Sequence, residues 1–172
     1  RALEYLNWEV PDWIVYPGGA LGNTSSCGKA LMELYQWGWI KKIPRIAVIN
    51  SEGASTLSDL YNGKFEEEEL RWNKGNPNTE LISRYYEFTN GVVTTVSDSE
   101  MLDGMSVVGL NGFDCEMASG ASVVGIKKLT EQGIIKKDDV VVGILTGRQK
   151  DAMIPVDYHS NSKNTFAIPP KN

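Results

Sequence analysis

The sequence predicts an α/β domain in which helices cover both faces of a parallel β-sheet, a three-layer α/β/α arrangement. Short apolar segments alternate with longer segments of helical periodicity, an order typical of βαβ units. The strand segments are apolar throughout rather than at every second position, as expected of strands buried on both faces. The 172 residues, 41% of them hydrophobic, suffice for one domain with a substantial core. We expect this domain to span residues 1–150 and a polar tail to span residues 151–172.

The first part of the chain contains two predicted strands. Residues 1–6 resemble the last turns of a helix, so we interpret the chain as a piece of a longer protein. Residues 13–16 form a compact apolar strand, and apolar residues at helical spacing predict a helix over 26–37. β-Branched residues predict a second strand over 46–49. A short helix is predicted over 55–61.

The middle of the chain is less regular until its third strand. The acidic run 66–69 is interpreted as a solvated surface, with a partner-binding patch as the alternative. A helix is expected to end at Phe88, and a third strand is predicted over 92–96. Ser97 to Glu100 has the spacing of a capping box, which predicts a helix over 101–110.

The last predicted elements bring two loops to one edge of the sheet. A helix is expected over 118–132 and a strand over 140–145. Ligands of parallel sheets bind beyond the carboxyl ends of the strands. The segment 18–23 follows the first strand, and Thr146 with Gly147 follows the last. We therefore expect these two loops to lie along the same rim.

The loop after the first strand has the composition of an anion-binding turn. It reads Pro-Gly-Gly-Ala-Leu-Gly-Asn over residues 17–23, between a strand and a helix. Such a turn leaves N–H groups unpaired at the positive end of a helix dipole, where a phosphate binds well. The loop lacks the spacing of a Walker loop or of a dinucleotide fingerprint. A tight turn without a ligand is the alternative interpretation.

Composition excludes several classes of function. The net charge of −5 and the lack of a basic, aromatic-rich cluster argue against nucleic-acid binding. No apolar run approaches membrane-spanning length. Cys27 and Cys115 lie far apart, and His159 is the one histidine, so a His/Cys metal site is not expected. Few cysteines indicate a reducing, cytoplasmic setting.

A collinear set of motifs supports a more specific interpretation. The segment 10–23, VPDWIVYPGGALGN, strongly resembles the phosphate-loop region of the threonine synthase family. Further matches follow in the same order along the chain: IPRIAV (43–48), SEGA (51–54), GNP (75–77), CEMAS (115–119), VGILTG (142–147) and DYHSN (157–161). Threonine synthases are fold type II, tryptophan-synthase-β-like enzymes that use pyridoxal 5′-phosphate, and the match covers the carboxyl-terminal half of that family's chain.

The resemblance implies a lyase of threonine biosynthesis that converts O-phospho-L-homoserine and water to L-threonine and phosphate. It implies a homodimer as well. The residues that match the loop holding the cofactor phosphate are Gly18, Gly19, Ala20, Leu21, Gly22 and Asn23. Thr146 matches the residue that faces the pyridine nitrogen, where a hydroxyl is expected to donate to a neutral nitrogen. Without the resemblance, Thr146 is interpreted as a strand-end threonine that bonds its own backbone.

Four other residues have weaker functional interpretations. Glu52 either lines the cofactor rim or is a surface glutamate, and Glu116 is interpreted as a capping residue before a small-residue helix. Cys115 is interpreted as a buried apolar residue rather than a nucleophile. His159 is interpreted as an exposed or packing residue.

The chain departs from the family pattern in two places. The family's Schiff-base lysine is expected upstream of Arg1, and Lys29, Lys127 and Lys150 lie outside its lysine motif. The segment before Gly75 is shortened and lacks the family's threonine/alanine-rich stretch. The alternatives are a related pyridoxal-phosphate-dependent threonine or serine dehydratase, and a non-catalytic remnant that binds a ligand.

Overall fold

A four-stranded parallel sheet forms the centre of the protein. The structure is a computed structural model and describes residues 2–61 and 89–148. The strands are β1 (Trp13–Pro17), β2 (Arg45–Ser51), β3 (Val92–Val96) and β4 (Val141–Gly143), in the spatial order β3-β2-β1-β4. Trp13 of β1 pairs with Arg45 on one side and with Val141 on the other. The predicted parallel sheet is confirmed.

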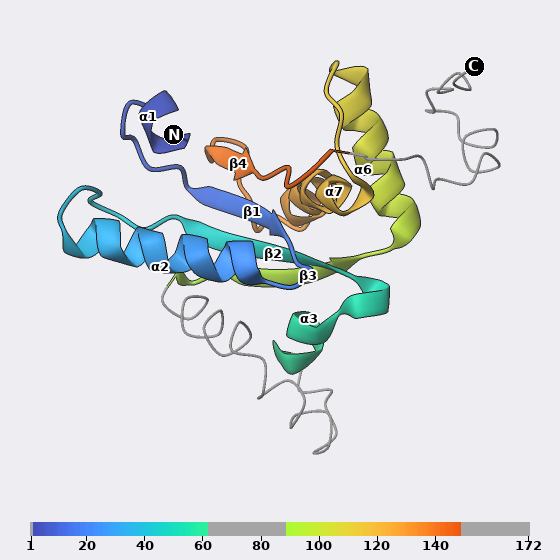
Figure 1. Cartoon of the computed structure of the whole chain (residues 1–172), viewed down its shortest axis with the longest axis horizontal. Helices are drawn as coiled ribbons and strands as arrows, with labels where there is room; N and C mark the ends of the chain where they lie inside the picture. Colours follow the sequence, from blue (N-terminus) through green and yellow to red (C-terminus); the bar gives the residue numbers. More distant parts are fainter. Residues whose placement is uncertain (1, 62–88, 149–172) are drawn as a thin grey trace.

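Helices cover both faces of this sheet (Figure 1). The helices α2 (Gly22–Gln36) and α3 (Thr56–Tyr61) lie on one face, and α6 (Asp98–Leu110) and α7 (Met117–Glu131) lie on the other. A short helix, α1 (Ala2–Tyr5), precedes β1, and a 3₁₀ turn, η1 (Glu52–Ala54), follows β2. No helix among these described segments is both long and apolar enough to cross a membrane.

Alternate residues of β1 and β2 supply two separate cores. Trp13 and Val15 of β1 point to the α6/α7 face, where they pack with Leu129. Ile14 and Tyr16 point to the α2 face, where they pack with Leu31. Because every residue from Trp13 to Tyr16 is buried, the strand has no solvent-facing positions at which polar residues could alternate with apolar ones. This explains why β1 reads as an uninterrupted apolar run.

The predicted elements that fall within residues 2–61 and 89–148 are present, with shifted ends. The capping box is confirmed, since the Ser97 side chain accepts from the Glu100 N–H while Glu100 accepts from the Ser97 N–H. Helix α2 begins at Gly22, four positions before the predicted start at Ser26. The reason is that Leu21 takes a left-handed conformation with φ 63°, which turns the chain into the helix at once. Strand β4 is shorter than the predicted 140–145.

Some predictions concern segments outside the described residues. They are the acidic run 66–69, the helix expected to end at Phe88, the Gly-Asn-Pro match at 75–77, the tail 151–172 with His159, and Lys150.

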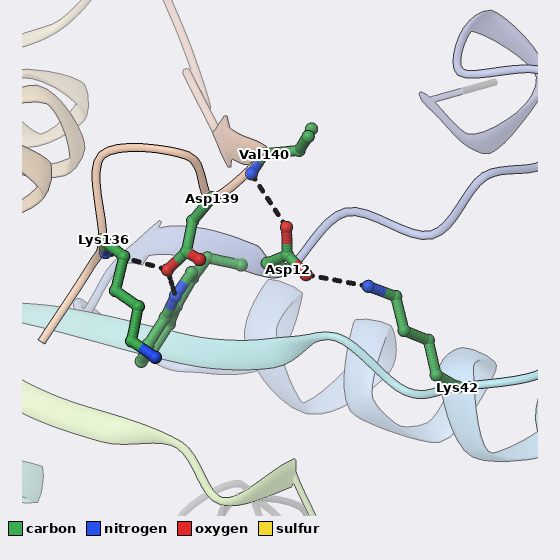
Figure 2. Close-up of polar contacts among 6 residues, drawn as sticks. Asp12, Lys42, Lys136, Asp139 and Val140 are labelled. Atoms are coloured by element: carbon green, nitrogen blue, oxygen red, sulfur yellow. Dashed lines mark hydrogen bonds and ion pairs between the residues drawn. The ribbon is translucent and has the colours of Figure 1, made fainter.

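A cluster of polar residues lies at the amino-terminal ends of the strands (Figure 2). The Asp12 carboxylate accepts a hydrogen bond from Lys42 Nζ at 2.8 Å and another from the Val140 N–H at 2.9 Å. The Asp139 carboxylate accepts from the Trp13 indole N–H and from the Lys136 N–H, both at 2.9 Å. These bonds connect the segment before β1 to the segments before β2 and β4.

Replacing Asp12 by asparagine is expected to lower the free energy of unfolding by less than about 1 kcal/mol at pH 7, because the pair with Lys42 is exposed. The hydrogen bond from Lys42, with that from Val140, lowers the pKa of Asp12. A carboxyl whose folded-state pKa is depressed stabilises the protein above its unfolded pKa of about 3.9, and this contribution is lost as the pH falls.

Urea unfolding at pH 7 and pH 3 tests this prediction for the wild type and for Asp12→Asn. The variant should lose less stability on acidification than the wild type does. The companion variant Lys42→Met removes the same ion pair and should reduce the acid sensitivity in the same direction. Equal acid sensitivity in all three proteins would show that the Asp12 cluster does not contribute to the pH dependence of stability.

Candidate functional site

The strand order places the carboxyl ends of β1 and β4 side by side. From β1 the chain moves outward through β2 to β3, then crosses the other face through α6 and α7 and returns beside β1 as β4. The helix after β1 and the helix before β4 therefore lie on opposite faces. A crevice at such a reversal of strand order is the usual ligand site of an open parallel sheet. The glycine loop follows β1 and Thr146 follows β4, so both lie at this edge of the sheet, as predicted.

The glycine loop is held at its first residue. The Gly18 N–H donates to the Ile49 carbonyl at 2.6 Å, and the Gly18 carbonyl accepts from the Asn50 side-chain amide. Asn50 is 1% exposed, and its amide oxygen also accepts from the Ser58 N–H at 3.1 Å. A side chain at Gly18 has no room, because its Cβ would lie 2.6 Å from Val48 Cγ1. The loop is thus fixed to the end of β2.

Beyond Gly18 the loop opens and presents unpaired donors. Gly19 is exposed, and a Cβ on it would meet nothing within 4 Å. No side chain caps the start of α2. Within the described part of this loop and first helical turn, N–H groups without an acceptor are those of Gly19, Leu21, Gly22, Asn23 and Thr24. Ala20 takes part in another interaction of the chain, so we do not count its N–H with them.

These donors form a site that suits an anion. The first turn of α2 carries the partial positive charge of the helix dipole, and its N–H groups have no internal partner. A phosphate group, with several acceptor oxygens and a double negative charge, fits these donors.

Beyond the carboxyl end of β4, Thr146 is held by two side chains from the amino-terminal region of α7. Its hydroxyl donates to Glu116 Oε1 at 2.8 Å and lies 3.1 Å from Ser119 Oγ. The Thr146 N–H also donates to Ser119 Oγ, at 2.9 Å. The Glu116 N–H in turn donates to the Gly147 carbonyl at 2.9 Å. The segment after β4 is therefore fastened to the start of α7.

The structure corrects the interpretation of Glu116. The residue does occupy the N-cap position of α7, but its side chain makes no capping hydrogen bond. It accepts from the Thr146 hydroxyl instead. The strand-end interpretation of Thr146 is also incomplete, because its hydroxyl bonds to side chains of another element rather than to its own backbone.

The other predicted residues that the structure describes provide no nucleophile at the rim. Cys115 is 1% exposed, and burial raises the pKa of its thiol, with a further contribution from Asp114 and Glu116. Burial also raises the pKa of the Cys27 thiol. Thiols held in this way are poor nucleophiles. Glu52 is exposed at the start of η1, just beyond the carboxyl end of β2.

Sequence reasoning missed two residues that shape the site. Asn50 fixes the glycine loop, and Ser119 fixes the segment after β4. A signal for Asn50 existed, since an amide at the end of an apolar strand is out of pattern and a buried amide needs partners. Ser119 gave no such signal, because it lies among several small residues at the start of a helix.

Comparison with known proteins identifies the relatives of this chain. The profile of the family described as "Pyridoxal-phosphate dependent enzyme" matches residues 2–147. The chain is 26% identical to threonine synthase 2, chloroplastic, of Arabidopsis thaliana over 96% of its length, and 30% identical to the threonine synthase of Methanocaldococcus jannaschii over 84%. It spans 34% and 38% of those two relatives.

A solved structure supports the fold. A fungal L-serine ammonia-lyase from Rhizomucor miehei superposes with a TM-score of 0.58 at 19% sequence identity, over 86% of this chain and 49% of that one. At this identity the likeness shows the fold alone. The expected fold type II architecture is confirmed by this match together with the family profile.

Proposed function

Because the chain belongs to the family of pyridoxal-phosphate dependent enzymes, we propose that it forms one side of the cofactor site of a threonine synthase. This enzyme is a lyase that converts O-phospho-L-homoserine and water to L-threonine and phosphate. The relatives named threonine synthase, which match most of this chain, support the assignment. The observation that carries it is the set of unpaired N–H groups at the start of α2.

The glycine loop would hold the cofactor's phosphate group. Gly19, Leu21, Gly22 and Asn23 contribute unpaired N–H donors, and the α2 dipole adds attraction for a dianion. The absence of a Cβ at Gly19, where space is open, lets an anion approach the backbone. Ala20 belongs to the same loop. A phosphate can be bound here without a basic side chain, because backbone N–H groups at a helix N-terminus already attract an anion.

Thr146 would face the pyridine nitrogen from beyond the carboxyl end of β4. Bound pyridoxal phosphate supplies an electron sink for negative charge that develops on an amino-acid substrate. The chain's own residues orient that group, with the loop at its phosphate end and the Thr146 hydroxyl, fixed by Ser119 at 3.1 Å, at its ring end. Holding the two ends of a flat ligand fixes its orientation between them.

Assembly and compartment are part of the same proposal. The family resemblance supports a homodimer. Cys27 and Cys115 are both free, which supports a reducing compartment such as the cytoplasm.

Cofactor binding tests the phosphate site directly. We expect the native protein to bind pyridoxal phosphate about 100-fold more tightly than pyridoxal, since charge-assisted hydrogen bonds contribute about 1.5–3 kcal/mol each. The isosteric variant Asn23→Asp adds a carboxylate among the donors. It should weaken pyridoxal-phosphate binding about tenfold or more by charge repulsion and leave pyridoxal binding unchanged.

Asn111→Asp is the matched control, because it makes the same exchange at an exposed site at the end of α6. Fluorescence titration of each variant gives the two dissociation constants. Equal affinity for pyridoxal and pyridoxal phosphate would reject the proposed phosphate site.

A substrate assay separates the enzymatic alternatives. The native protein, loaded with cofactor, is supplied with O-phospho-L-homoserine or with threonine, and phosphate and 2-oxobutanoate are measured. Phosphate release with threonine formation is the expected result. Formation of 2-oxobutanoate from threonine without phosphate release from phosphohomoserine would indicate a dehydratase. Turnover of neither substrate would indicate a non-catalytic ligand-binding protein.

A further inference from the structure

A buried side-chain amide connects the first peptide of the glycine loop to α3. Asn50, near the end of β2, is 1% exposed. Its amide nitrogen donates to the Gly18 carbonyl, and its amide oxygen accepts from the Ser58 N–H of α3 at 3.1 Å. Both partners are main-chain groups, and they belong to two different segments. One side chain therefore holds the glycine loop and α3 together.

The partners of Asn50 fix the orientation of its amide. A carbonyl oxygen can only accept and a main-chain N–H can only donate, so the nitrogen faces Gly18 and the oxygen faces Ser58. An ionised aspartate would keep the acceptor and lose the donor, and a leucine would lose both. Asparagine is the side chain of this size that satisfies the two segments at once.

The Gly18 carbonyl and the Gly19 N–H belong to the same peptide group. In a trans peptide these two bonds point in opposite directions, and the described residues contain no cis peptide. Because the Gly18 carbonyl accepts from Asn50, the Gly19 N–H is directed away from Asn50. That N–H is one of the unpaired donors of the loop. Asn50 thus sets the direction of a donor that it does not touch.

Glycine on both sides makes this peptide easy to rotate. Glycine adopts backbone conformations that are closed to other residues, so little in Gly18 or Gly19 themselves prevents the peptide from turning over. A rotated peptide would present its carbonyl oxygen where the Gly19 N–H now lies, and that oxygen would repel an anion. The hydrogen bond from Asn50 opposes the rotation. It also polarises the peptide, which makes the Gly19 N–H a stronger donor.

We infer that Asn50 is a positioning residue of the proposed phosphate site, which directs the Gly19 N–H toward the anion and couples the occupied loop to α3. This inference rests on the proposed function. An anion that accepts from the Gly19 N–H polarises the same peptide from its other end and strengthens the bond between Gly18 and Asn50. Because Asn50 also accepts from Ser58, occupation of the loop stabilises the start of α3.

Asn50→Asp isolates the donor, because it keeps an acceptor for Ser58 and places a carboxylate against the Gly18 carbonyl. At pH 8 we expect the variant to bind pyridoxal phosphate about tenfold more weakly than the wild type does, and pyridoxal equally well. Burial favours the neutral form of a carboxyl, and a protonated carboxyl again offers a hydrogen to Gly18. At pH 5.5 the difference from the wild type should therefore shrink to about threefold or less. Asn50→Leu, with neither donor nor acceptor, should show no such recovery.

The wild type measured at the same pH corrects for every other group that titrates. The titratable side chains on the described elements around Asn50 are Tyr16, Cys27, Glu52, Asp59 and Asp98. They are identical in the wild type and in the variants, as is the phosphate of the cofactor. Asn111→Asp makes the same exchange at the exposed end of α6 and should bind pyridoxal phosphate as the wild type does at both pH values.

Amide hydrogen exchange, followed by NMR, tests the coupling to α3. Ser58 is 6% exposed, so its N–H exchanges when α3 opens. In the wild type, pyridoxal phosphate should slow this exchange by about threefold or more, and pyridoxal should not. In Asn50→Asp the exchange should no longer respond to pyridoxal phosphate, and in Asn50→Leu it should be fast without any ligand. The Gln132 N–H, at the far end of α7, is the reference that should not respond.

The possible results separate this inference from the proposed function. Equal wild-type affinity for pyridoxal and pyridoxal phosphate would overturn both. Phosphate-selective binding in the wild type that is unchanged in Asn50→Asp, or weakened to the same extent at both pH values, would overturn the inference alone. The wild-type exchange at Ser58 needs no variant, and a rate that ignores pyridoxal phosphate while the cofactor is bound would also overturn the inference alone. Recovery of Asn50→Asp at low pH, with a ligand-dependent Ser58 N–H in the wild type, would establish the role of Asn50.

Discussion

Replacing Gly120 by alanine is expected to destabilise the protein by about 3 kcal/mol or more. A Cβ at this position would lie 2.0 Å from the Met101 carbonyl oxygen and 2.9 Å from the Met105 nitrogen. Both atoms belong to the backbone of α6, so neither can move aside without shifting the helix. Overpacking of a well-packed core costs about 1–3 kcal/mol and sometimes more. The gain in helix propensity, about 1 kcal/mol at most, does not compensate.

The close contact between α6 and α7 involves a glycine on each helix, so the prediction can be tested at a second position. A Cβ at Gly104 of α6 would lie 2.2 Å from the Gly120 carbonyl oxygen. Gly104→Ala should therefore be about as damaging as Gly120→Ala. The control is Lys127→Ala on the exposed side of α7, which should change stability by less than about 0.5 kcal/mol. Urea unfolding of the four proteins measures the effect, and glycine variants within about 1 kcal/mol of the wild type would disprove this close approach of the two helices.

Gly18→Ala should damage both stability and the proposed phosphate site. The new Cβ would lie 2.5 Å from the Asn50 amide nitrogen and 2.6 Å from Val48 Cγ1. Val48 and Asn50 are buried side chains of β2, so relief requires the loop to move away from the strand. We expect a loss of about 2–3 kcal/mol in the free energy of unfolding. We also expect at least about tenfold weaker binding of pyridoxal phosphate, because the donors of the loop would no longer converge.

The neighbouring residue provides a matched control. Gly19→Ala adds the same methyl group where nothing lies within 4 Å. Its stability should remain within about 0.5 kcal/mol of the wild type. Thermal unfolding of both variants separates the two positions, and cofactor titration measures the effect of Gly18→Ala on binding. Equal stability of Gly18→Ala and Gly19→Ala would contradict the close packing of Gly18 on β2.

The strands, and the two loops at the carboxyl edge of the sheet, could be predicted because both follow from the local order of apolar segments and turns. Continuous apolar runs such as residues 13–16 identified strands buried on both faces. The rule that ligands bind beyond the carboxyl ends of parallel strands then selected the glycine loop and Thr146. In the structure these two segments follow the carboxyl ends of the neighbouring parallel strands β1 and β4. Their assigned roles toward the cofactor remain predictions.

Helix ends were harder to predict, because their signal is weak where small polar residues begin a helix. The first turn of α2 contains Gly22, Asn23, Thr24 and Ser25, which give no apolar periodicity. The predicted start at Ser26 therefore came too late. This difference matters for the proposed phosphate site. Gly22 and Asn23 belong to the first turn of α2 rather than to an irregular loop, so their N–H groups lie at the positive end of the helix dipole.

Contacts between distant segments could not be deduced from pattern at all. Glu116 and Thr146 are 30 positions apart, and nothing local indicates that the two side chains meet. Capping was a reasonable prediction for a carboxylate before a helix. It was wrong because the segment after β4 passes so close to the start of α7 that the threonine hydroxyl offers a better-placed hydrogen for the carboxylate.

The pairing of β1 with β4 has a consequence for how the protein is made. Trp13 and Val141 are neighbours in the sheet although most of the described chain is synthesised between them. The loop proposed to hold the cofactor phosphate is therefore translated well before Thr146, the residue proposed to face the cofactor ring. The two proposed ends of the cofactor site become available at different times during translation, first the glycine loop and later Thr146.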